Sequence, residues 1–190
     1  MNMRIARIIT LAAILGAPTV WGQNEMKNIE ALKTGALAQR SEAIKALLQT
    51  RQDIISALLP IMDGNVSADI KRDVAKVLGE YRAVEAVDPL VRNLELELQP
   101  RILKGLIKQI DLYPISQALS KIGKPAIPAL LAKIAETDNS ALIHRCAQVC
   151  VDIEGREVAE LVMNRHWEKA PTSEAKQRLK QALDAMQKVK

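Results

Sequence analysis

The sequence contains no phenylalanine, and its 190 residues include only two tyrosines and two tryptophans. Hydrophobic residues nevertheless make up 48% of the chain. The core must therefore be built from leucine, isoleucine, valine and alanine, which suits stacked helices better than a β-sandwich. Runs of alternating β-branched residues and Asn-Gly turns, the usual indications of strands and hairpins, are also missing. The composition predicts an all-α fold.

Motifs of known catalytic and phosphate-binding sites are absent as well. The chain has no nucleophile elbow, no phosphate-binding loop and no metal-binding helix motif. Its two histidines, His144 and His166, have no carboxylate or nucleophile at a spacing that suggests a shared site. We expect no catalytic residues, no cofactor and no bound metal.

Cysteine is scarce too, and the two cysteines, Cys146 and Cys150, lie four residues apart on one predicted helix. A regular helix holds such residues about 6 Å apart with poorly converging Cβ atoms, which is close to the strained limit of disulfide geometry. A metal site with His144 is less favoured still, because His144 points about 200° away from Cys146 on a helical wheel. Free cysteine is usually buried. We predict two reduced thiols in the core, with a disulfide as the alternative.

The first 22 residues have the pattern of a secretory signal peptide. Arg4 and Arg7 form a basic start, the uncharged run from Ile8 to Val20 follows, and cleavage is expected after Gly22. The main alternative is a membrane anchor, but a span needs about 20 apolar residues, more than this run provides. A mitochondrial presequence fits less well because the run is not amphipathic. We predict a mature domain at 23–190, periplasmic or secreted, with no membrane span after cleavage.

Charge gives little indication of a nucleic-acid partner. The chain carries a net charge of +5, and loss of the two signal arginines would leave 25 basic against 22 acidic residues, or about +3. A small excess of this kind is ordinary for a solvated surface. The mature chain also has only Tyr81, Tyr113 and Trp167 to stack on bases. We expect no nucleic acid among its partners.

The stretch from Ala118 to Ile134 has the glycine and proline signals expected where one helix ends and the next begins. Gly123 follows the first apolar segment, and Pro125 and Pro128 open the second. Glycine just past a helix end and proline in the first turn of the next helix are typical of such corners. Neither helix can bury its apolar stripe alone, so we predict that each packs on the other and on neighbouring pairs.

Similar pairs recur along the chain, which indicates a repeat protein. The first is expected at 40–61, with Asp53 as the N-cap of its second helix, and the next at 71–94. Set in register, Lys71 falls on Arg40 at an offset of 31 residues. A helix ending at Gly35 and a final lysine-rich helix with a stripe of apolar residues are expected to cap the two ends. That stripe is Ala175, Leu179, Ala182, Leu183 and Met186.

The remaining two pairs depart from this spacing or are less regular. In the third, an insertion at 99–113 precedes Pro114, and we interpret it as the start of a long, kinked first helix. It carries a basic stripe, Arg101, Lys104 and Lys108. In the fourth, the first helix turns at Gly155, and the second is expected to bury Val158, Leu161 and Val162 against it.

Aligned in this way, the repeats share a basic residue, Ala-Ala, Leu-Gly, then Ala and Pro-x-Leu, best matched at 71–90 and 118–131. The pattern resembles the HEAT-repeat family, most closely its short bilin-lyase-like branch. The resemblance implies a right-handed α-solenoid of about four antiparallel helical pairs, whose second helices line a concave binding face. The departures are the insertion, the missing glycine after Leu47, and Asp152 where the fourth repeat would carry glycine.

A repeat stack without a catalytic constellation predicts a non-enzymatic scaffold that binds another protein. Glu85, Arg92 and Glu136 point away from the expected core of the second helices, so they are candidates for the binding face. The stripe of Arg101, Lys104 and Lys108 is the other candidate surface. The resemblance leaves one alternative, a bilin-lyase-like enzyme or accessory subunit. Export argues against this alternative, because the partners of such lyases are intracellular.

Overall fold

The computed structural model describes residues 23–48, 54–98 and 113–188, and within these ranges all regular structure is helical. The prediction of an all-α fold is confirmed. The α-helices, in chain order, are α2 (Gln23–Thr34), α3 (Leu37–Leu47), α4 (Ile55–Asp63), α5 (Ala68–Glu80), α6 (Val87–Asn93), α7 (Pro114–Ile122), α8 (Ile127–Glu136), α9 (Ser140–Glu154), α10 (Arg156–Lys169) and α11 (Ser173–Lys188). Short 3-10 segments are η2 (Val84–Ala86), η3 (Leu94–Leu98) and η4 (Lys124–Ala126).

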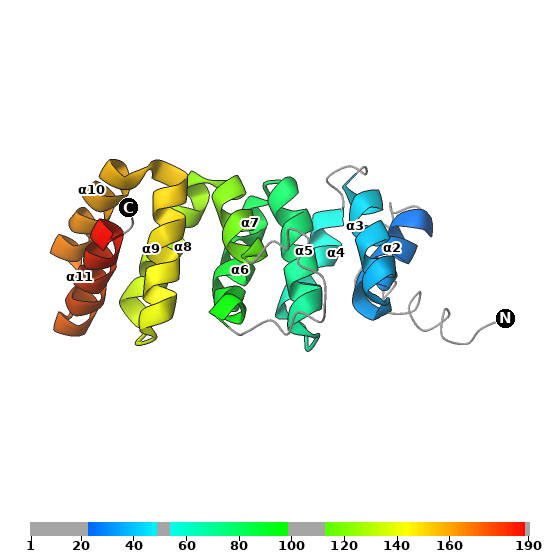
Figure 1. The fold of residues 1–190 in the computed structure, drawn as a ribbon, viewed down its shortest axis with the longest axis horizontal. Helices are drawn as coiled ribbons and strands as arrows, with labels where there is room; N and C mark the ends of the chain where they lie inside the picture. Colours follow the sequence, from blue (N-terminus) through cyan, green and yellow to red (C-terminus); the bar gives the residue numbers. More distant parts are fainter. Residues whose placement is uncertain (1–22, 49–53, 99–112, 189–190) are drawn as a thin grey trace.

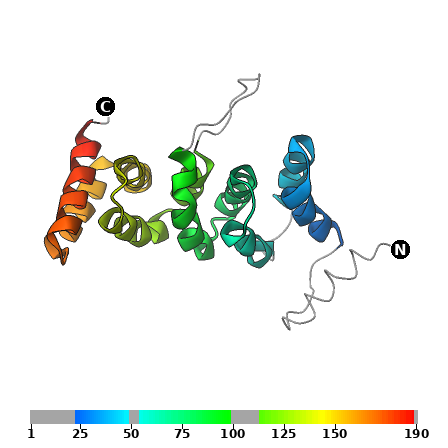
Figure 2. The same ribbon diagram turned by 90° about the horizontal axis from the view of Figure 1, so that it is seen from below.

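The helices form an elongated row with α2 and α3 at one end and α10 and α11 at the other (Figure 1). Along the row α3, α5, α7 and α9 each contact the next, as do α4, α6 and α8. Figure 2 shows the same row as successive two-helix units. The predicted capping helices α2 and α11 therefore lie at the ends, and all five residues of the predicted stripe on α11 are buried.

The main contacts between consecutive helices join α2 with α3, α4 with α5, α6 with α7, α8 with α9, α9 with α10 and α10 with α11. The sequence predicts that the helix before Gly123 and the helix after it pack on each other and on neighbouring pairs. Gly123 and the 3-10 turn η4 separate α7 from α8, and η4 contacts both helices. The main neighbours of α7 are α5, α6 and α9, and those of α8 are α9 and α11.

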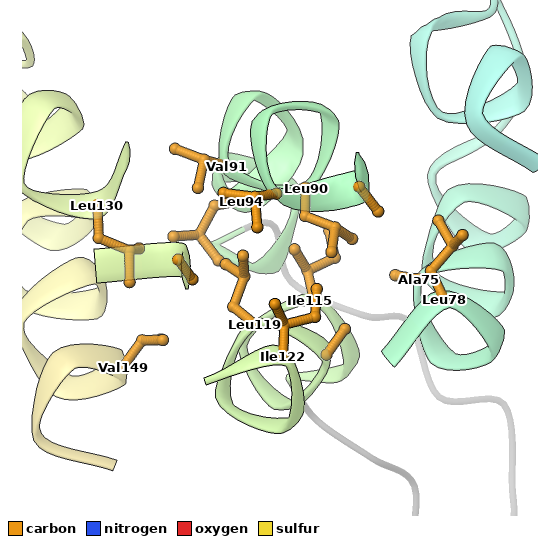
Figure 3. Packing of buried hydrophobic residues seen from close by; sticks show 14 of the residues in the cluster. Ala75, Leu78, Leu90, Val91, Leu94, Ile115, Leu119, Ile122, Leu130 and Val149 are labelled. Carbon is orange, nitrogen blue, oxygen red and sulfur yellow. The ribbon is translucent and has the colours of Figure 1, made fainter. Parts of the chain in front are cut away.

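The core runs along the whole row and is made of aliphatic side chains, as the composition predicts. At its centre, Leu90 and Leu94 from α6 and η3 face Ile115 and Leu119 from α7 (Figure 3). All four of these side chains are 0% exposed. Figure 3 also shows side chains of α5 on one flank and Leu130 of α8 on the other, so the core continues from unit to unit.

The backbones of α5 and α7 come unusually close at Gly79. A Cβ atom added to Gly79 would lie 2.6 Å from the Cα of Ala118. A side chain at this position would thus collide with backbone, which cannot rotate away. The glycine of the Leu-Gly pair in the second repeat is therefore a packing residue inside α5.

One predicted face is wrong at Val158 and Leu161, whereas its third residue, Val162, is half-buried against the core as predicted. In α10, Leu161 is 51% exposed and Val158 is 44% exposed, while Ala159 and Met163 are buried. The helix is apolar on both sides, and its neighbours α9 and α11 cover only the side that carries Ala159 and Met163. Sequence periodicity does not distinguish the two sides.

Several predictions fall outside the described residues. These are the signal peptide at 1–22, Asp53 as an N-cap, and the long helix over 99–112 with Arg101, Lys104 and Lys108. At the boundaries of these gaps, the N-cap position of α4 is Ile54, and Pro114 opens α7 in its first turn. Within the described ranges, none of the helices has the length and apolar character needed to cross a membrane.

Candidate binding groove

A groove runs along the outer face of α9. The helix begins where the Oδ1 atom of Asn139 accepts hydrogen bonds from the backbone N–H groups of Ala141 and Leu142, at 3.1 and 3.2 Å. It ends at Gly155, whose φ of 77° is a conformation that side-chain-bearing residues rarely adopt. These two signals fix where α9 begins and ends.

The groove has a volume of about 430 Å³. The described residues of its polar lining are His144, Arg145 and Gln148, all from α9. Its apolar lining combines α9 with Leu98 at the end of η3 and with Ala185 and Met186 of α11. The site therefore joins three segments that are far apart in sequence, and its volume lies in the range of small-ligand pockets.

Arg145 is the most distinctive residue of the groove. Its guanidinium carbon lies 3.5 Å from the centroid of the Tyr113 ring, so the planar cation stacks on the aromatic face. Its Nε is buried and has no hydrogen-bond partner among the described residues. A buried N–H group without an acceptor costs about 1–3 kcal/mol, so an arginine held in this way needs an explanation.

Glu97 lies close enough to Arg145 to interact with its charge, and it caps the N-terminus of helix α7. Its Oε1 atom accepts hydrogen bonds from the backbone N–H groups of Ile115 and Ser116, at 2.5 and 2.9 Å, and its Oε2 atom accepts from the Ser116 hydroxyl. The residue is only 7% exposed. Burial raises the pKa of this carboxyl above its ordinary value, although the Ser116 and Ile115 hydrogen bonds and the charge of Arg145 pull it downward. The carboxylate thus caps a helix whose start lies 17 residues further along the chain.

The three predicted site residues that the structure describes are all exposed, as expected. Glu85 lies in η2, and Glu136 is the last residue of α8. Arg92 of α6 makes a two-pronged ion pair with Asp63 of α4, at 2.9 and 3.0 Å. Within the described ranges no hydrogen bond or ion pair joins Arg92 to Glu85 or Glu136. This ion pair links α6 to α4, and one nitrogen of the Arg92 guanidinium is already bound to Asp63.

The cysteines are free and buried, as predicted. Burial raises the pKa of both Cys146 and Cys150 to about 12, so neither thiol is a nucleophile near neutral pH. Among the histidines, His166 is exposed on α10, and His144 lines the groove. The described residues contain no cluster of three or more side chains suited to a metal.

Sequence reasoning missed Glu97, Arg145 and the groove itself. A charged residue inside an otherwise apolar run was the available signal for both Glu97 and Arg145, but such a residue more often faces solvent. Comparisons with protein-family models, with curated proteins and with solved structures find no match for this chain.

Proposed function

We propose that the chain is an exported, non-enzymatic scaffold that binds another protein, built as a right-handed α-solenoid of HEAT-like repeats. The observation that carries the proposal is the row of helix units, each packed on the next along one axis (Figure 2). A row of this kind offers long faces for binding, because each unit contacts only its neighbours. The repeated sequence pattern with its 31-residue offset supports the HEAT-like interpretation.

Contacts between units support a rigid binding surface. Arg40 pairs with Asp73 at 2.8 Å across α3 and α5, and Arg178 pairs with Asp138 at 2.6 Å across α11 and the α8–α9 connection. Asn93 of α6 donates a hydrogen bond to the carbonyl oxygen of Met62 in α4 at 3.0 Å. Such contacts hold neighbouring units in register, which lets residues from several units recognise one partner.

Site-specific crosslinking tests the proposal. A photoreactive amino acid would replace Glu85, Arg92 or Glu136 in the full chain, expressed and exported in its native host. We expect one and the same partner protein attached at all three positions. Arg165 and Gln177, exposed on the end helices α10 and α11, are matched control positions.

Two outcomes would contradict the binding proposal: no adduct at any of the three positions, or the same adducts at the control positions.

Export has its own test in N-terminal sequencing of the purified chain. We expect the mature protein to begin at Gln23. A stable form in the membrane fraction that begins at Met1 or Met3 would instead show that the first segment is retained as an anchor.

A further inference from the structure

We propose that the groove between α9 and α11 binds a short extended segment of a partner protein, one that carries a carboxylate flanked by aliphatic side chains. The inference rests on the proposed function, because it names the kind of partner segment that the scaffold would recognise. Three features of the groove carry it: its charge, its unused hydrogen-bond donors and the layout of its walls.

The charge of the groove favours an anion. Among the described residues that line it, Arg145 is the only one with a permanent charge and none is a carboxylate, while Asp152 accepts a hydrogen bond from the lining residue Gln148. The nearest buried carboxylate is Glu97, but both of its oxygens already accept hydrogen bonds from Ile115 and Ser116. Glu97 therefore lowers the cost of burying Arg145 without forming an ion pair with it.

Arg145 is prepared for an acceptor that the described chain does not supply. Stacking on Tyr113 fixes the plane of the guanidinium, and no described residue accepts a hydrogen bond from its nitrogens. The Nε is enclosed, so the terminal nitrogens are the donors that a ligand can reach. A pre-oriented guanidinium of this kind suits a carboxylate, which accepts two parallel N–H bonds.

The walls of the groove favour a peptide over a simple fatty acid. The lining residues on α9 run from Ala141 to Val151, about 15 Å along the helix, which matches four or five extended residues. His144 lies within this strip, as does Gln148, whose Nε2 donates to Asp152 at 2.8 Å and whose Oε1 remains an acceptor. Both side chains can hydrogen-bond a peptide backbone, whereas an alkyl chain offers neither of them a hydrogen bond. Leu98, Ala185 and Met186 provide the apolar contacts for the flanking side chains.

The test uses two matched peptides, acetyl-Leu-Asp-Leu-Leu-amide and acetyl-Leu-Asn-Leu-Leu-amide, titrated into the ¹⁵N-labelled full chain and followed by NMR. We expect the Asp peptide to bind about tenfold more tightly than the Asn peptide, with shifts centred on α9 and α11. Arg145→Met should abolish the difference between the peptides. Arg165→Met, which removes an exposed positive charge from α10, should leave it unchanged.

A second variant keeps the test decisive if Arg145→Met does not fold. Ala185→Leu leaves the arginine in place and fills part of the groove, so it should weaken both peptides. Equal affinity for the Asp and Asn peptides, or shifts that map elsewhere, would overturn the proposal. Tighter binding of decanoate than of the Asp peptide, with the same dependence on Arg145, would also overturn it and assign the groove to a free amphiphile.

The groove and the scaffold proposal can fail separately. If the Arg145→Met variant crosslinks to the same partner in undiminished yield, the groove is not the binding site of that partner, although the scaffold function stands. If the Asp peptide binds as expected but crosslinking finds no partner, the groove is a binding site and the scaffold proposal fails.

Discussion

The corner between α5 and α6 and the corner between α7 and α8 connect comparable helices with different residues. After α5, Arg82 adopts the left-handed conformation with φ of 50°, and the N–H of Ala83 donates to the Leu78 carbonyl. After α7, Gly123 takes φ of 83° instead. Both corners then pass through a 3-10 turn into the second helix. A helix can therefore end without glycine when the following residues reproduce the capping hydrogen bonds.

The same two helices also begin differently. The hydroxyl of Ser67, immediately before α5, accepts a hydrogen bond from the N–H of Ile70 at 3.4 Å. Helix α7 has no such local cap, and Glu97 from the preceding unit takes that role. The start of α5 is thus a local property of the sequence, whereas the start of α7 depends on tertiary structure.

The largest predicted loss of stability tests whether α6 and α8, the helices that follow the two corners, pack into the core to the same extent. Leu90 and Leu130, 40 residues apart, are both 0% exposed. Leu90→Ala and Leu130→Ala should each lower the free energy of unfolding by about 2–5 kcal/mol, because each removes a side chain packed between units. Denaturant melts measure the loss. A loss below about 0.5 kcal/mol at one site alone would show that the corners are not equivalent.

Gly79→Ala tests whether glycine in α5 serves packing. In a helix open to solvent this change would stabilise by up to about 1 kcal/mol. Here the new Cβ meets the backbone of Ala118, so we expect a loss of about 1–3 kcal/mol in thermal or denaturant unfolding. The neighbouring exposed Glu80, which pairs with Lys121 of α7 at 2.5 Å, gives the comparison on the same seam, and Glu80→Ala should cost no more than the roughly 0–1 kcal/mol of a surface ion pair. Stabilisation by Gly79→Ala would mean that α5 and α7 lie further apart.

Gly123→Ala tests whether the glycine after α7 is needed for its positive φ. Nothing lies within 4 Å of the added Cβ, so any loss must come from the positive φ. We expect a loss of about 1–2 kcal/mol. Gly155→Ala, with φ of 77° and equally open surroundings, should give a similar value. A neutral result at both glycines would show that these corners relax freely.

The residues that mark many helix ends could be predicted from the sequence, whereas the helices that pack against each other could not. Gly123, Pro128 and the apolar stripe of α11 are local signals, and the structure confirms them. The left-handed Arg82, the cap from Glu97 and the stacked Arg145 depend on neighbours brought together by folding. An apolar stripe shows that a face is buried, but it does not identify the covering helix.

Glu97→Gln tests the dependence of α7 on its distant cap. The pKa of Glu97 is raised in the folded state, so its contribution to stability is full below the unfolded pKa and is lost as pH rises through the folded pKa. The stability of the native chain relative to the Gln variant should therefore decline across that range. Unfolding free energies measured from pH 4 to 8 provide the comparison. An advantage of the native chain that grows with pH would contradict this assignment.

The smallest effect is expected for Arg82→Gly. Glycine relieves the left-handed strain at the end of α5, but it also increases the conformational freedom of the unfolded chain. The two contributions nearly cancel, so we expect a net gain within about 0.5 kcal/mol. A loss above 1 kcal/mol in the same melts would show that the Arg82 side chain itself supports the corner.

The clamp between Glu97 and the start of α7 also affects how the protein can tolerate insertions. Hydrogen bonds hold residue 97 against residues 115 and 116, and Arg72 donates to the Leu96 carbonyl on the same side. Residues 97, 115 and 116, on either side of the intervening stretch, are thereby held together by contacts that lie outside it. For a flexible loop, the entropic cost of closure rises by only about 0.6 kcal/mol per doubling of its length. We therefore expect that residues inserted between 98 and 113 leave the helix row folded, which a thermal melt of the lengthened chain would show.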